Sequence, residues 1–187
     1  RIIDGTIANP IEDGVVVITD GRIRTVGPRS AVTVPDGAQI IDVAGKTIMP
    51  GLINAHGHVG GTLGLEGGHY NTDNLLRQLG LYARYGVTTV NSLGGDEEQG
   101  FALRNSQFGQ DLDRARIYVA GSVVLGDTEA KIRAEVNRNA DMGANFIKVR
   151  IDDELGTAEK MPRNIFDALV DQAHIRRLPV AVHLFYL

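Results

Sequence analysis

Cysteine is absent from the 187 residues of this chain, and aromatic residues make up only 5% of it. Without cysteine the chain has no disulfides, no thiolate metal ligands and no cysteine nucleophile. The lack of disulfides does not separate a cytoplasmic from a periplasmic protein, so both compartments stay open. No apolar run approaches the roughly 20 residues that a membrane-spanning helix requires, and we expect no membrane partner.

Basic residues are neither in excess nor clustered. Asp and Glu number 23 against 19 Lys and Arg, which leaves a net charge of −4, and the arginines are scattered along the chain. This charge gives no reason to expect nucleic acid as a partner. With 43% hydrophobic and 22% charged residues, the composition is that of an ordinary soluble globular protein.

Residues 1–48 are predicted to form a small antiparallel β module. β-prone runs at residues 15–18 and 22–26 flank Asp20-Gly21, where glycine accepts the positive φ that a tight hairpin turn requires. A further strand is expected at residues 38–43.

Residues 49–187 show a different pattern, in which strands and helices alternate. Strands are expected at residues 48–56, 87–93, 117–121, 145–151 and 179–187, with helices at 72–86, 97–105, 127–143 and 162–177. This order predicts an α/β fold with parallel strands and outer helices, either the first half of a (β/α)8 barrel or an open doubly wound sheet. No Gly-x-Gly-x-x-Gly follows the first strand, so a dinucleotide fold loses its usual support. Because the fifth strand runs to Leu187, we expect the chain to be the N-terminal part of a longer protein.

The run from Pro50 to His58 ends in two histidines separated by one residue. Side chains alternate across an extended strand, so His56 and His58 are expected on one face and Gly57 on the other. Two imidazoles at a strand end form half of a divalent metal site, although a chance meeting of two histidines would give the same spacing. Their place at the end of the first strand favours the barrel, whose active sites lie at that end.

Lys148 and His183 are expected on the same inner surface. In the fourth strand the aliphatic side chains alternate with Lys148 and Arg150, and in the fifth they alternate with His183. If the aliphatic faces pack under helices, the polar residues point into the barrel. A lysine that reaches solvent or pairs with a carboxylate, and a satisfied core histidine, remain the alternatives.

These features together resemble the metal-dependent amidohydrolase superfamily, in its imidazolonepropionase-like and prolidase-like branches. The resemblance rests on Pro-Gly-Leu-Ile-Asn-Ala-His-Gly-His at residues 50–58, on Gly-Val-Thr-Thr-Val at 86–90, and on the hairpin and lead-in of the β module. It implies a small β-sandwich segment at residues 1–48 and barrel strands at 49–187. It also implies one or two divalent ions, zinc first among them, held by His56, His58, His183 and a carboxylated Lys148. The general acid/base aspartate of the family would lie beyond Leu187.

The activity implied by the resemblance is hydrolysis of an amide-like C–N bond by a metal-activated hydroxide, in a peptide-like or cyclic amide substrate. A mononuclear deaminase is the nearest alternative, and it would need no bridging Lys148. A third alternative is an inactive half-barrel that acts as a binding or assembly module. Homo-oligomers are left open.

Candidate substrate contacts are His69 and Tyr70, in the glycine-rich loop after the first strand, and Arg150, which could bind a carboxylate of a small or dipeptide-like substrate. Ordinary loop roles for the first two, and an ion pair of Arg150 with one of the acidic residues 152–154, compete with this interpretation.

Overall fold

The computed structural model describes residues 1–109 and 112–185, in two compact units, 1–51 and 52–187. The sequence places this boundary between residues 48 and 49. In the described part of the chain, no helix is both long and apolar enough to cross a membrane.

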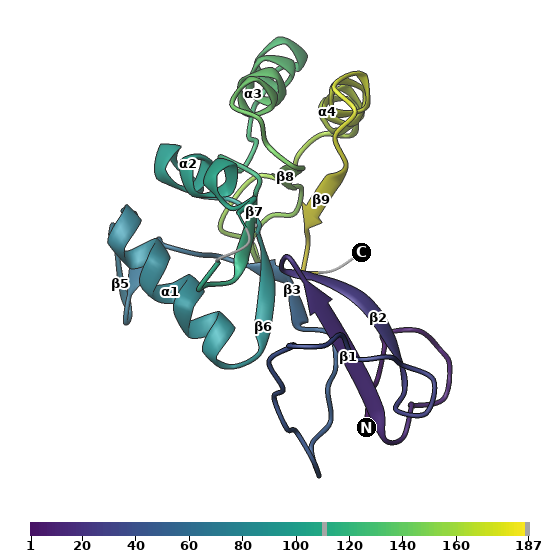
Figure 1. Cartoon of the computed structure of the whole chain (residues 1–187). Coiled ribbons are helices and arrows are strands. Elements are labelled where there is room, and N and C mark those ends of the chain that lie inside the picture. Colours follow the sequence, from purple (N-terminus) through teal and green to yellow (C-terminus); the bar gives the residue numbers. More distant parts are fainter. Residues whose placement is uncertain (110–111, 186–187) are drawn as a thin grey trace. The chain divides into compact units, whose positions relative to one another are not determined.

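The first unit contains a β-hairpin, shown in purple in Figure 1. Strand β1 (Gly14–Thr19) pairs antiparallel with β2 (Arg22–Pro28), and a bulge lies between Val17 and Ile18. Asp20 and Gly21, both at positive φ (51° and 67°), form the turn, as predicted.

The strand predicted at residues 38–43 is wrong. These residues have no strand pairing in the structure, and Ile40 and Ile41 are 71% and 76% exposed. Alternating β-prone residues form a strand only where a neighbouring strand takes up their backbone hydrogen bonds.

The second unit alternates strands and helices. Its elements follow in chain order: β3 (Leu52–Gly57), β4 (Thr62–Leu63), β5 (Glu66–Gly67), α1 (Thr72–Arg84), β6 (Val87–Ser92), α2 (Glu98–Ser106), β7 (Arg116–Val119), α3 (Glu129–Asp141), β8 (Ile147–Arg150), α4 (Arg163–Ile175) and β9 (Val180–His183). The predicted strands and helices are present with bounds that differ by up to four residues, whereas the β4–β5 hairpin in the glycine-rich loop was not predicted. Residues 186–187 of the predicted fifth strand lie outside the described residues.

Strands β3, β6, β7, β8 and β9 of this unit pair in parallel, whereas β4 and β5 form a separate antiparallel hairpin. β6 is paired between β3 and β7, and β8 is paired with β9. A parallel bridge between Val124 and Val149 connects the segment after β7 to β8. Figure 1 shows α1 to α4 along the outside of these strands. The result is a parallel α/β arrangement, as the alternating pattern predicted.

Side-chain caps set the beginnings of two helices. Asn71 precedes α1, and its side chain accepts a hydrogen bond from the Asn74 N–H at 2.9 Å. Thr128 precedes α3 and accepts from the Lys131 N–H. Such caps satisfy an N–H that the first helical turn leaves free.

Two apolar clusters hold the helices to the strands. The first lies between α1, α2, β6 and β7 and includes Leu75, Leu79 and Val90, all fully buried. The second lies between α3, α4 and β8 and includes Ile147, Val149 and Leu169, also fully buried. Strands β6, β7 and β8 therefore turn one face toward the helices, and their alternate side chains face the other way.

Candidate active site

His56 and His58 lie together at the carboxyl end of β3. Their ring centroids are 5.5 Å apart and the ring planes are tilted by 56°. Gly57 faces the opposite way, because a Cβ there would lie 2.7 Å from Val90 Cγ1 of the first apolar cluster. The close approach of β6 therefore requires glycine at this position and leaves both imidazoles on the exposed face.

Backbone and side-chain contacts orient the pair. The Asn54 Oδ1 atom accepts from the His56 N–H at 3.1 Å, and its Nδ2 donates to the Tyr82 hydroxyl at 3.2 Å. The His58 Nδ1 lies 3.2 Å from the carbonyl oxygen of Gly94, in the loop after β6. A carbonyl oxygen only accepts, so this contact requires the proton on Nδ1 and leaves the lone pair on Nε2.

Lys148 is the most buried charged residue of the candidate set. It is 3% exposed, and within the described residues its Nζ has no hydrogen-bond partner. It lies in β8 between Ile147 and Val149, which belong to the second apolar cluster, so its side chain points away from α3 and α4. A Cβ on Gly94 would lie 3.4 Å from the Lys148 Cγ, so the loop that contacts His58 also packs on the lysine. Burial lowers the pKa of the Lys148 amine.

His183 ends β9 and is aligned with Arg150 of β8. Its half-buried ring meets that of Phe185 edge to face at 4.8 Å. Val182, before it, packs against the second apolar cluster. His183 therefore leaves the helix-facing side, as does Lys148.

Lys148, His58 and His183 act electrostatically on His56. Burial lowers the pKa of the His56 imidazole, with further lowering from three neighbouring positive or titratable groups: Lys148, His58 and His183. Burial and these groups disfavour the imidazolium and so favour the neutral form of His56, which is the form that binds metals.

The described residues do not contain a closed set of ligands. Among residues 1–109 and 112–185, no group of three or more His, Asp and Glu side chains gathers closely enough to hold a metal ion. The structure thus brings His56 and His58 together and turns Lys148 and His183 toward the same side, without joining the three histidines into one cluster.

Two buried carboxylates lie after strand ends: Asp96 was not predicted from the sequence, and Asp152 was predicted only as a candidate ion-pair partner of Arg150. Asp96, 4% exposed, follows β6, and Asp152, 5% exposed, follows β8. Asp96 Oδ2 accepts from the N–H groups of Ala120 and Gly121, and Asp152 Oδ2 accepts from the Phe185 N–H. Each carboxylate thereby ties the end of one strand to the end of the next. In the sequence, the signal that could have identified these two carboxylates was their position shortly after predicted strands.

Burial raises the pKa of the Asp96 carboxyl. The neighbouring Ser92 side chain and the N–H groups of Ala120 and Gly121 oppose this increase, as would a positive charge on His58. The side chain is therefore held by directional contacts in a site that disfavours its charge.

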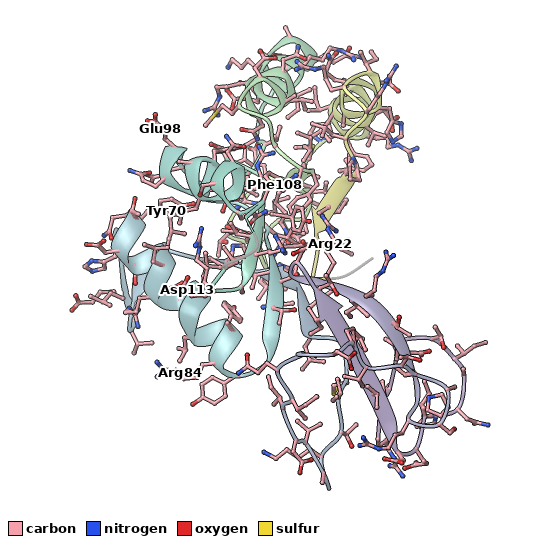
Figure 2. The ribbon with its side chains drawn as sticks, viewed as in Figure 1. Arg22, Tyr70, Arg84, Glu98, Phe108 and Asp113 are labelled. Carbon is pink, nitrogen blue, oxygen red and sulfur yellow. The ribbon has the colours of Figure 1, made fainter. Side chains whose placement is uncertain are left out.

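The three candidate substrate contacts have other partners. His69 Nε2 lies 3.7 Å from a carboxylate oxygen of Glu66. Tyr70, labelled in Figure 2, packs on the first apolar cluster with its hydroxyl buried against α2, where a Cβ on Gly100 would lie 2.2 Å from it. Arg150 forms an ion pair with Glu154, the pairing that competed with a ligand role.

Two hollows of the second unit lie along α1. One of about 730 Å³ is lined by Leu76, Arg84 and their neighbours, and one of about 510 Å³ by Thr62, Tyr85 and their neighbours. Neither includes a residue of the candidate metal set, so they do not define the site.

The sequence of this chain is similar to parts of several known proteins. An uncharacterized protein of Mycobacterium tuberculosis is 30% identical over 178 residues, which is 90% of this chain and 45% of that protein. A 5-methylthioadenosine/S-adenosylhomocysteine deaminase of Nitratidesulfovibrio vulgaris is 50% identical over 54 residues, 28% of this chain and 12% of the deaminase. An imidazolonepropionase of Rhizobium rhizogenes is 42% identical over 62 residues, 32% of this chain and 15% of the enzyme. No family model matches.

Solved structures agree on the fold. Phenylurea hydrolase B superposes with a TM-score of 0.83 at 21% identity, over 97% of this chain and 53% of the hydrolase. Molinate hydrolase superposes with a TM-score of 0.81 at 22% identity, over 98% and 52% of the two chains. The chain thus spans about half the length of these proteins, and less than half of the mycobacterial relative.

Proposed function

The chain belongs to the amidohydrolase superfamily and matches the N-terminal portion of its members, and from this premise we propose that the complete protein is a metal-dependent hydrolase of an amide-like C–N bond. The substrate class we propose is a small peptide-like or cyclic amide molecule. His56, His58, Lys148 and His183 would hold one or two divalent ions, with zinc the leading candidate.

The observation that carries this proposal is the buried amine of Lys148. A lysine that is 3% exposed and has no hydrogen-bond partner among the described residues is costly, and its side chain lies on the strand face that carries no helix. Gly94 connects it to the histidine pair, since the same residue packs on Lys148 and accepts from His58. For a lysine with only a structural role, this burial would cost free energy without compensation. A bound metal ion would supply the compensation.

The donor atoms also fit a divalent ion. The contact with Gly94 leaves the Nε2 lone pair of His58 free, and burial together with the neighbouring groups lowers the pKa of His56, which favours its neutral form. Neutral imidazoles are ligands for zinc and similar ions. When bound, such an ion would polarise a carbonyl and lower the pKa of water toward about 7.

Lys148 would contribute as a carbamate. Burial lowers its pKa, so more of the amine is neutral and nucleophilic at a given pH. The neutral amine adds to CO2, a C–N bond forms, and one N–H proton leaves to solvent. The cation is replaced by an anion with two oxygens, which suits two cations about 3.5–4 Å apart.

The proposal is tested on the complete protein by metal analysis and by activity on a panel of dipeptides, N-acyl amino acids and cyclic amides. We expect about two ions per chain, loss of activity after chelation, and recovery when Zn²⁺ is added back. A preparation verified as metal-free that retains full activity would overturn the proposal.

A mononuclear deaminase is the second candidate, favoured by the 50% identity with a 5-methylthioadenosine/S-adenosylhomocysteine deaminase over 54 residues. The number of metal ions bound per chain distinguishes the proposed hydrolase from a mononuclear deaminase. One ion per chain, unchanged by Lys148→Ala, and ammonia released from an aminopurine would favour the deaminase.

A further inference from the structure

The loop between β6 and α2 connects the candidate site to the next strand. Gly94 and Gly95 have φ of +105° and +81°, in the region that side chains other than that of glycine rarely adopt. A Cβ on Gly94 would lie 2.6 Å from Val123 Cγ2, so the backbone is pressed against the segment after β7. The carbonyl of this tightly packed Gly94 is the one that faces His58 Nδ1 at 3.2 Å.

Asp96 fastens the other end of this loop. Its Oδ2 accepts from the Ala120 N–H at 2.9 Å and from the Gly121 N–H at 3.2 Å, and its own N–H donates to the Gly121 carbonyl at 3.2 Å. These three bonds all cross from the loop after β6 to the residues after β7. The side chain is 4% exposed, and Oδ1 is buried without a hydrogen-bond partner among the described residues. A buried carboxylate that uses one oxygen for two backbone amides acts as a fixed anchor.

We propose that Asp96 is a positioning residue that sets the tautomer and orientation of His58 through the carbonyl of Gly94. With Asp96 in place, the Gly94 carbonyl is held where it can accept only from a protonated Nδ1, and Nε2 keeps its lone pair for a ligand. Partners of this kind behind a metal-binding histidine determine which nitrogen is available. The ligand role of His58 rests on the proposed function, whereas the tautomer assignment rests on the contacts alone.

A second buried side chain offers a matched control. Gln107, 1% exposed, holds the opposite end of β7 by accepting from the Ile117 N–H at 2.8 Å and donating to the Ile117 carbonyl at 2.9 Å. It anchors the same strand with similar bonds, at the end opposite to the residues that Asp96 holds. Loss of this anchor should affect stability and leave His58 unchanged.

The experiment compares Asp96→Ala, Asp96→Asn and Gln107→Ala in the complete protein. The affinity for Zn²⁺ is measured by competition with a chelator. The tautomer of His58 is measured in the metal-free protein by long-range ¹H–¹⁵N correlation on [¹⁵N]histidine-labelled samples, with His58→Gln used for assignment.

We expect Asp96→Ala to weaken Zn²⁺ binding by about 10- to 100-fold and to convert His58 from one tautomer to a mixture. Asp96→Asn, which keeps an oxygen for the two amides, should recover most of the affinity. Gln107→Ala should lower the melting temperature and leave both measurements at the wild-type values.

Three results would overturn the inference. The first is an Asp96→Ala protein with unchanged affinity and tautomer. The second is Asp96→Asn as impaired as Asp96→Ala, which would point to the charge of Asp96 instead of its anchoring bonds. The third is Gln107→Ala with the same losses, which would mark them as general destabilisation.

A further variant covers the case in which Asp96→Ala does not fold. Gly94→Ala keeps the carboxylate but moves the carbonyl, because its Cβ cannot fit against Val123. A mixed His58 tautomer supports the inference, and an unchanged tautomer overturns it. If the wild-type protein binds no Zn²⁺, the proposed function fails, and the tautomer measurement still decides the role of Asp96.

Discussion

Strands β3 and β8 both carry residues of the candidate site, but they lie in opposite surroundings. Among the described residues, β3 is paired only with β6, and its apolar residues Leu52 and Ile53 are 54% and 65% exposed in this chain. In β8, Ile147, Lys148 and Val149 are all buried. Placing a histidine pair on an exposed strand costs little folding free energy. Burying a lysine amine inside a strand costs much more, and other interactions must compensate for that cost. Lys148 is therefore more informative about function than the histidine motif, although the motif is easier to recognise.

Substituting a ligand on β3 or the lysine on β8 should have the largest effect on activity. His56→Ala and Lys148→Ala should each lower kcat/KM about a thousand-fold, equivalent to about 4 kcal/mol of lost transition-state stabilisation. Steady-state kinetics with parallel metal analysis would test this, with His174→Ala on the exposed face of α4 as the control. Full activity in both site variants would contradict the shared-site interpretation.

The two strands should differ sharply in their contribution to stability. Ile147→Ala should lower the free energy of unfolding by about 2–5 kcal/mol, because it empties a fully buried position. Ile53→Ala on β3 should cost within about 0.5 kcal/mol at its 65% exposed position. Urea unfolding of the metal-free 187-residue chain would measure both, because the exposures of Ile53 and Ile147 are those of this chain. Equal losses would show that β3 is as well packed as β8.

The burial of Lys148 predicts a pH dependence of stability. Its pKa in the folded state lies below the reference value of 10.5, so between the two values the unfolded chain binds more protons. Metal-free protein should therefore gain stability as pH rises through this interval, and the penalty should be complete below the folded-state pKa. Lys148→Met should remove that slope in thermal unfolding followed from neutral pH toward pH 10. A wild-type curve without the slope would indicate that the amine is paired or already modified.

A smaller effect is expected at Asn54. Asn54→Ala removes the hydrogen bonds to the Tyr82 hydroxyl and from the His56 N–H, and should cost about 1 kcal/mol of stability. Since it also frees the backbone before His56, Zn²⁺ affinity should decrease modestly. Asn54→Asp retains the acceptor for the His56 N–H and should restore the affinity. If Asn54→Ala and Asn54→Asp change the Zn²⁺ affinity by the same amount, the hydrogen bond from the His56 N–H does not contribute to that affinity.

Local patterns in the sequence predicted much of the fold. Asp20-Gly21 marks the hairpin because its backbone geometry is needed whatever surrounds it. The strand–helix alternation from residue 49 onward depends on side-chain periodicity, which each segment carries within itself. The strand predicted at residues 38–43 failed because pairing depends on a neighbour that local sequence does not specify.

The spacing of His56 and His58 by itself determined that two imidazoles share a face, since alternation along a strand is a property of the backbone. The alternating apolar residues around Lys148 determined likewise which way its side chain turns. Only the tertiary structure decided that Lys148 is buried without a hydrogen-bond partner, that Gly94 connects it to His58, and that Asp96 anchors that loop. Burial and hydrogen bonds between strand ends depend on residues far apart in the chain, and those distances are set by packing.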